Sequence, residues 1–213
     1  DFKSLAGKKV AAAAVESTRR AWPLVARRQG LRADAFQWQT TDFSARDNVM
    51  VRGDVDAATY FHDSAVSLFA RMRPETLSVL KYADAGVDLY GNAILASSNL
   101  VAQNPKLVAA FLRASNRAIV ETFADPAPSI AAMRQREPIL DEKIERERWN
   151  ITAQYVGAAD TRGHGLGDIR KLTLERQVDE VADVFGLKVK PASDAIFNTT
   201  MLPSRTERTL PKA

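Results

Sequence analysis

The fold of this chain is decided by the stretch Lys8-Lys9-Val10-Ala11-Ala12-Ala13-Ala14-Val15-Glu16-Ser17-Thr18 (residues 8–18). Residues 9–14 form an apolar run of strand length, and a polar turn follows it. Residues 17–29 carry apolar side chains at helical spacing and stop at Gly30, a residue type that commonly ends helices. Pro23 lies too deep for a first helical turn, which predicts a kink there or a helix that begins near Trp22.

The same alternation of strand and helix continues to residue 60. Side chains alternate around Phe36 and Trp38 and predict a strand over residues 35–41. A short helix over residues 45–51 ends before Gly53, and a third strand is expected over residues 55–60. We therefore predict one sheet in which the first and third strands are parallel neighbours, an α/β unit of the kind that binds ligands at its strand ends.

After residue 60 the pattern becomes mainly helical. A helix is expected over residues 63–72, and residues 76–82 and 87–96 look extended around a turn at Ala85-Gly86. Four further runs have helical periodicity, at residues 105–123, 129–136, 142–158 and 169–185. We place the boundary between two domains so that residues 8–88 form the α/β lobe and residues 89–213 form a second, largely helical part.

Two of these helices carry apolar stripes that have little to pack on. The first stripe is Leu107, Phe111, Ala114 and Ala118, and the second is Leu174, Val178, Val181 and Phe185. Helices of an α/β layer bury such stripes against a sheet, but only the expected strand over residues 87–96 is available here. The stripes are therefore expected to lack a cover within this chain.

Composition indicates an ordinary globular protein. Of the 213 residues 46% are hydrophobic and 26% charged, and no apolar run is long enough for a membrane span. The chain contains no Cys, which excludes disulfides and a Cys nucleophile. The net charge is +4, but the basic doublets are scattered and interrupted by acids, so we expect no nucleic-acid partner.

Several segments together resemble a known family. Residues 104–114, Asn-Pro-Lys-Leu-Val-Ala-Ala-Phe-Leu-Arg-Ala, are similar to a helix found in bacterial solute-binding proteins of the taurine, alkanesulfonate and NMT1/THI5-like type. Residues 90–97 resemble the segment that returns to the first lobe of these type II periplasmic binding proteins. Phe185-Gly186-Leu187 and Met201-Leu202-Pro203 are similar to their closing segment.

The resemblance implies an α/β fold with one complete lobe two and the helical C-terminal part of lobe one. The N-terminal part of lobe one is then absent, so an oligomer or a missing N-terminal segment would cover the orphan stripes. The implied function is the solute-binding component of an ABC importer, which captures a small organic ligand, anionic or heteroaromatic, between two lobes without catalysis. Its partner would be the transporter permease, and its place periplasmic, or extracytoplasmic with a membrane anchor. The alternative is an enzyme like the THI5-type pyrimidine-precursor synthases, but these rely on Cys residues that this chain lacks.

Seven residues are candidates to bind the ligand: Glu16, Ser17, Thr18, Arg19, Trp38, Tyr60 and Asn92. The first four open a helix after a strand, where free backbone N–H groups and the helix dipole favour anions, and Arg19 or Arg20 could clamp a carboxylate or sulfonate. The alternative is that Ser17 is only an N-cap and the arginines are solvated. Trp38 and Tyr60 lie at strand ends, as ring surfaces for a ligand or as core aromatics, and Asn92 lies at the return crossing.

No catalytic or metal site is expected, and no cofactor. The two histidines, His62 and His164, lack converging metal ligands in sequence. The glycine-rich run at residues 163–168 does not follow a strand, so its context does not fit a nucleotide-binding loop. No Gly-x-Ser-x-Gly nucleophile motif is present.

Overall fold

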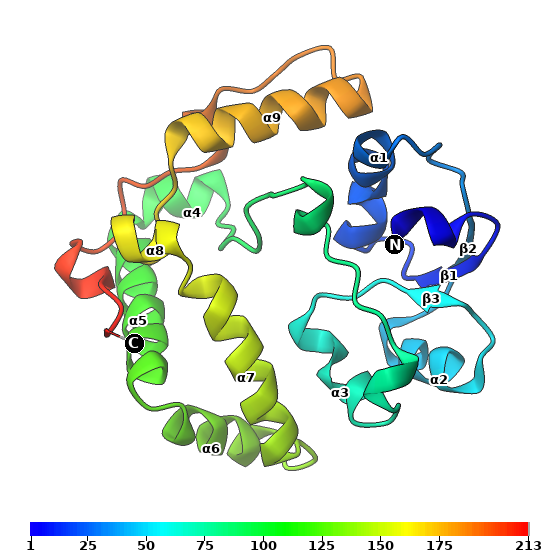
Figure 1. Ribbon diagram of the computed structural model, residues 1–213. Helices are drawn as coiled ribbons and strands as arrows, with labels where there is room; N and C mark the ends of the chain where they lie inside the picture. The colour runs from blue at the N-terminus through cyan, green and yellow to red at the C-terminus, as the bar shows by residue number, and fades with distance from the viewer. Residues whose placement is uncertain (213) are drawn as a thin grey trace. The chain divides into compact units, whose positions relative to one another are not determined.

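The computed structural model describes residues 1–212, which divide into two compact units. The first unit is Asp1–Leu89 and the second begins at Tyr90. The first unit contains a small parallel sheet with helices, and the second unit is built from helices, as Figure 1 shows. The α/β fold class expected from the sequence is confirmed.

The first unit is organised by a three-stranded parallel sheet. Its strands are β1 (Lys9–Ala12), β2 (Gln37–Thr40) and β3 (Ala57–Ala58), in the order β2-β1-β3. Val10 lies opposite Trp38 on one side and Ala57 on the other. The prediction that the first and third strands are parallel neighbours in one sheet is confirmed. The central strand is buried, since Val10, Ala11 and Ala12 are covered, and small apolar residues suit a strand with helices on both faces.

Two helices connect these strands and lie on opposite faces of the sheet (Figure 1). They are α1 (Ser17–Gln29) and α2 (Phe43–Arg52), and each ends at a left-handed glycine, Gly30 with φ 66° and Gly53 with φ 75°. The expectation of a helix start near Trp22 was wrong, because α1 begins at Ser17 and contains Pro23 in its interior. Burial of Trp22, Leu24 and Val25 outweighs the hydrogen bond that proline forfeits, a cost of about 3 kcal/mol.

An aromatic row supports α1 on the sheet. The Trp22 and Phe36 ring centroids are 4.6 Å apart, and those of Phe36 and Trp38 are 4.7 Å apart in an edge-to-face arrangement. The Trp22 indole N–H donates to the carbonyl of Ala33 at 2.9 Å, which satisfies the one polar group of this buried side chain. Trp38 therefore packs against Phe36 and is only partly buried.

The rest of the first unit consists of short pieces. They are η1 (Phe2–Leu5), η2 (Asp63–Ala65), α3 (Val66–Phe69), η3 (Pro74–Thr76) and η4 (Ala83–Ala85). The turn at Gly86 is present, with φ 80°. The prediction of a strand over residues 87–96 was wrong, because no residue of this segment lies in a strand. A strand needs a neighbour for its backbone hydrogen bonds, and this segment has none among residues 1–212.

The second unit contains the four long helices that the sequence predicts, with ends shifted by up to two residues. The helices of the unit are α4 (Ser98–Gln103), α5 (Pro105–Ala124), α6 (Ala127–Arg136), α7 (Glu142–Val156), α8 (Ala159–His164), α9 (Lys171–Phe185), α10 (Ser193–Ile196) and η5 (Thr206–Arg208). Trp149 of α7 packs edge-on against Phe123 of α5 with centroids 5.2 Å apart. No helix within residues 1–212 is long and apolar enough to cross a membrane.

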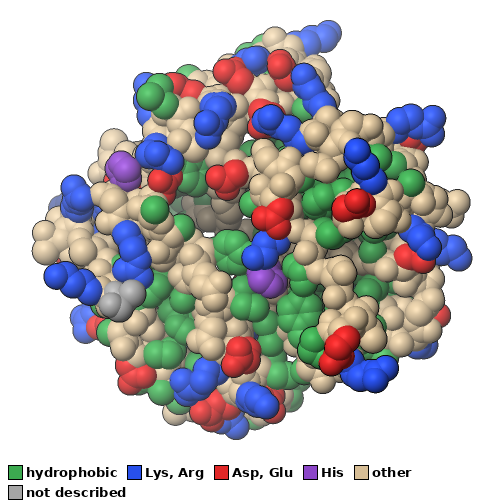
Figure 2. Space-filling model, viewed as in Figure 1, with side chains coloured by type: hydrophobic (Ala, Val, Ile, Leu, Met, Phe, Trp, Pro, Cys, Tyr) green, Lys and Arg blue, Asp and Glu red, His purple; other side chains and the backbone are tan. Residues whose placement is uncertain are grey.

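The apolar stripe of α5 is uncovered, as the sequence predicts. Leu107 is 59% exposed and Phe111 is 58% exposed, and Ala114 and Ala118 are also exposed. Hydrophobic side chains reach the surface over the region of α5 and α7 in Figure 2, with basic and acidic side chains interspersed around them. The stripe of α9 differs, because Leu174, Val178 and Val181 are half-buried and only Phe185 is exposed.

The glycine-rich run has a structural use. Leu166 donates its N–H to the carbonyl of Arg208, and the buried Arg208 guanidinium donates to the Leu166 carbonyl and to Asp168 at 3.1 Å each. A Cβ at Gly165 would stand 3.0 Å from that guanidinium. The run thus fastens the C-terminal segment of the chain.

The packing of α1 on the sheet gives a stability prediction. Leu24→Ala removes a side chain that is 1% exposed and should lower the free energy of unfolding by about 2–5 kcal/mol, since it leaves a cavity. The matched control is Leu172→Ala, also in a helix but 80% exposed, which should change stability by less than about 0.5 kcal/mol. Urea unfolding followed by tryptophan fluorescence measures both. Equal losses in the two variants would contradict this packing.

Candidate functional site

Polar and aromatic side chains gather where the three parallel strands end. Glu16 follows β1, Thr40 ends β2, and Thr59 and Tyr60 follow β3. Because the strands are parallel, their carboxyl ends meet at one edge of the sheet, where ligands bind in open α/β sheets. This edge is the candidate binding site.

A buried ion pair lies at the centre of this edge. Glu16 Oε1 is 2.6 Å from Nη1 of Arg46, which comes from α2, and the two residues are only 3% and 5% exposed. The other carboxylate oxygen, Oε2, accepts a hydrogen bond from the Thr59 hydroxyl at 2.6 Å and from the backbone N–H of Ala13 at 3.3 Å. The Glu16 carboxylate therefore joins the ends of β1 and β3 to α2.

Tyr60 covers the cation of this pair. The Arg46 guanidinium carbon lies 3.8 Å from the centre of the Tyr60 ring, within the range of a cation–π contact. The Tyr60 hydroxyl donates to Asp47 Oδ1 at 2.7 Å, and the Ser67 hydroxyl donates to Asp47 Oδ2 at 2.8 Å. Burial and the Asp47 carboxylate raise the pKa of Tyr60, so its hydroxyl stays protonated and acts as a donor.

Arg19 lies on the β2 side of the edge. Its Nη1 donates to the Thr40 hydroxyl at 2.9 Å, and its guanidinium carbon lies 5.1 Å from the centre of the Trp38 ring. Both Arg19 and Trp38 are partly exposed. The guanidinium is thus oriented by two neighbours and still accessible, a suitable arrangement for a carboxylate or sulfonate.

The start of α1 lacks a side-chain cap. Glu16 occupies the N-cap position but makes no capping hydrogen bond, because its carboxylate turns to Ala13, Thr59 and Arg46. The Thr18 hydroxyl oxygen is buried and has no partner within residues 1–212, and Ser17 is exposed. The Thr18 carbonyl accepts from the Tyr82 hydroxyl at 3.0 Å. Donor groups are therefore left at this helix start, as expected from the sequence.

Six of the seven residues predicted for the site belong to the first unit. Arg19 and Trp38 are in contact, and Tyr60 and Glu16 are linked through Arg46. Ser17 and Thr18 lie between these two groups along the chain. Asn92 belongs to the second unit, where it is exposed in a segment without helix or strand.

Sequence reasoning missed Arg46, Asp47 and Thr59. A signal for Arg46 exists, since it lies three residues before Val49 and so shares the buried face of α2 with it. A charged residue on an apolar helical face requires a buried partner of opposite charge. The sequence does not reveal that this partner is Glu16, thirty residues earlier.

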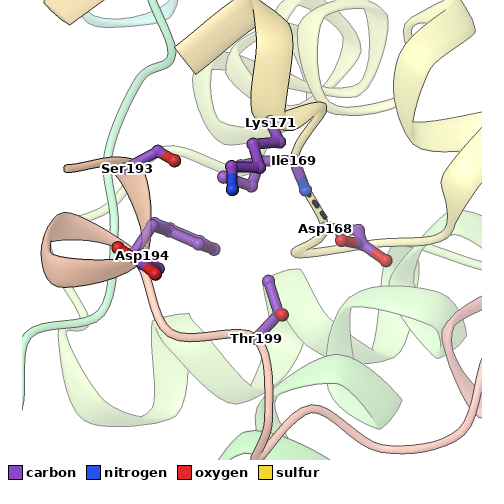
Figure 3. Close-up of a pocket in the computed structure, with 7 residues that line it drawn as sticks. Asp168, Ile169, Lys171, Ser193, Asp194 and Thr199 are labelled. Atoms are coloured by element: carbon purple, nitrogen blue, oxygen red, sulfur yellow. Dashed lines mark hydrogen bonds between the residues drawn. The ribbon is translucent and has the colours of Figure 1, made fainter. Parts of the chain in front are cut away.

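A small hollow lies within the second unit, at the start of α9 (Figure 3). It has a volume of about 160 Å³ and is lined by Asp168, Ile169, Lys171, Ser193, Asp194, Phe197 and Thr199. Two of its polar side chains already have partners, since Asp168 accepts from the N–H of Ile169 and from Arg208, and Ser193 donates to Glu175. Within residues 1–212 no cluster of three or more metal-binding side chains is present.

Comparisons with known proteins identify the family. A sequence model described as NMT1/THI5 like matches residues 1–129, more than half of the chain, and the chain therefore belongs to this family. No curated protein sequence matches it. A similar solved structure is the periplasmic sulfonate-binding protein SsuA of a sulfonate ABC transporter from Methylobacillus flagellatus KT, with 16% sequence identity and a TM-score of 0.46. That match covers 99% of this chain and 59% of the other, so the chain spans about three fifths of that protein's length.

The ion pair predicts a specific pattern of stability losses. Arg46→Met leaves the buried Glu16 carboxylate without its counter-charge and should lower the free energy of unfolding by about 3–5 kcal/mol. The double variant Glu16→Gln/Arg46→Met, which removes both charges, should recover at least half of that loss. Urea unfolding at pH 7 measures both variants. A single variant within about 1 kcal/mol of the unmodified chain would contradict the buried pairing.

Proposed function

We propose that this chain is the ligand-binding part of an extracytoplasmic solute-binding component of an ABC importer. Membership of the NMT1/THI5-like family supports this role. The partner would be a membrane permease, and capture would proceed without a chemical reaction. The cargo would be a small organic molecule with an anionic group or a heteroaromatic ring.

The observation that carries this proposal is the oriented cation at the sheet edge. Arg19 is fixed by Thr40 and by the face of Trp38, next to the uncapped start of α1. An acidic group of the ligand would pair with Arg19, and other polar groups of the ligand would accept hydrogen bonds from Ser17 and Thr18. Its flat or apolar part would contact the rings of Trp38 and Tyr60. Because Arg19, Trp38 and Tyr60 are already held by their neighbours, binding would cost little conformational entropy in these side chains.

The remaining candidates have supporting roles in this proposal. Glu16 holds the edge together through its ion pair and does not face the ligand, since it is buried. Asn92, which is exposed in the second unit, stays a proposed ligand-binding residue. Arg20, considered beside Arg19 at the sequence level, is exposed and serves as a comparison.

The proposal predicts which substitutions weaken binding. Thermal-shift screening of alkanesulfonates, pyrimidines and aromatic acids identifies a compound that binds the unmodified chain. For that compound, Arg19→Ala should weaken affinity about 10- to 100-fold, the worth of a charge-assisted hydrogen bond. The apo melting temperature should change by less than about 2 °C because Arg19 is partly exposed. Calorimetric titration measures the affinity.

The matched control is Arg20→Ala, which removes the same charge one position along the helix and should retain affinity within about twofold. Equal losses in both variants would mean that net charge, and not the oriented guanidinium, attracts the ligand. Retained affinity in both would show that the ligand binds elsewhere. Conversion of the bound compound, detected by mass spectrometry, would favour an enzyme over a binding protein.

A further inference from the structure

We infer that the Glu16 carboxylate is a built-in anion that fills the anion-binding position between β1 and α1 and so determines where a ligand's acidic group can bind. The consequence for the ligand rests on the proposed function. The occupancy of the position by Glu16 does not, and it can be tested without knowing the ligand.

The position has the properties of an anion site. It lies at the turn from a parallel strand to the start of a thirteen-residue helix, where backbone N–H groups and the helix dipole favour negative charge. It also contains a cation, Arg46, whose residue is only 5% exposed. A buried guanidinium requires a negative partner, because an unpaired charge away from water is costly.

The chain itself supplies the negative partner. Three donors from three parts of the first unit converge on one carboxylate: the Arg46 guanidinium, the Thr59 hydroxyl and the Ala13 N–H. Glu16 stands at the N-cap position of α1, yet it makes no capping bond and turns its carboxylate to these donors instead. A carboxylate held by three donors takes the place that a free anion would take.

Glu16 does not satisfy every donor of the Arg46 guanidinium, so an anion with more oxygen atoms could form an additional hydrogen bond there. Arg46 Nε is buried and has no hydrogen-bond partner within residues 1–212, although Nη1 binds Glu16. The Tyr60 ring covers the guanidinium at 3.8 Å and excludes water from that face. If the Glu16 charge is removed, the buried Arg46 guanidinium has no counter-charge, and an external anion could supply it.

This arrangement restricts the proposed ligand. An acidic group at the β1–α1 turn would find the counter-charge there, Arg46, already paired with Glu16, so the turn offers it no free cation. The partly exposed Arg19, on the β2 side, is the cation left for it. Glu16 is therefore a specificity-determining residue that directs the acidic end of the ligand to Arg19.

The test uses inorganic sulfate as the probe. Melting temperatures of the unmodified chain, Glu16→Gln and Glu16→Gln/Arg46→Met are measured in sodium sulfate and in sodium chloride at equal ionic strength. Sulfate stabilises proteins generally, and any binding at Arg19 is common to all three, so the unmodified chain and the double variant define the background. Glu16→Gln should gain about 2–4 °C beyond that background, because sulfate binds the uncompensated Arg46.

Two results would overturn the inference. In the first, sulfate raises the melting temperature of Glu16→Gln no more than that of the double variant. In the second, sulfate raises the melting temperature of the unmodified chain and Arg46→Met abolishes this increase, which would mean that Glu16 does not fill the anion-binding position. If Glu16→Gln is unfolded in chloride, its refolding yield in sulfate, compared with that of the double variant, gives the same decision. Failure here leaves the Arg19→Ala result intact, so the proposed function and this inference fail separately.

Discussion

The first unit depends on a buried ion pair between a residue that follows the central strand and a residue in the second helix. Glu16 and Arg46 lie 2.6 Å apart and are almost fully covered. Neither charge is tolerable alone in that environment, so the β1–α1 turn and α2 are fixed relative to each other. Thr59 adds the end of β3 to the same carboxylate. One side chain thus fixes the edge of the sheet at which a ligand would bind.

The accessible part of that edge is built on this support. The aromatic row of Trp22, Phe36 and Trp38 holds α1 against the sheet, and Arg19 of α1 lies over the last ring of the row. The guanidinium is oriented by packing and by Thr40, and it forms no salt bridge with any residue from 1 to 212. Its charge therefore stays available for an external anion, whereas the charge of Arg46 is already used.

Local pattern predicted much of the fold but only part of the site. The helix from Ser17 to Gln29 and the parallel pairing of β1 and β3 follow from periodicity and terminal glycines, which act over a few residues. The expected strand over residues 87–96 failed because strand formation depends on a distant partner that local sequence does not reveal. The same limit applies to Arg46, whose partner is thirty residues away, and to the uncovered stripe of Leu107 and Phe111. Arg19 and Trp38 were predictable as candidates, but their contact was not.

The central claim is that the carboxyl edge of the β2-β1-β3 sheet binds the ligand. Hydrogen–deuterium exchange with and without a compound that raises the melting temperature tests it most directly, because it locates binding along the whole chain. The account predicts slower exchange in peptides that cover residues 14–20 and 38–42 when the compound is bound. Protection confined to residues 168–199, around the hollow at the start of α9, with the sheet edge unchanged, would contradict it.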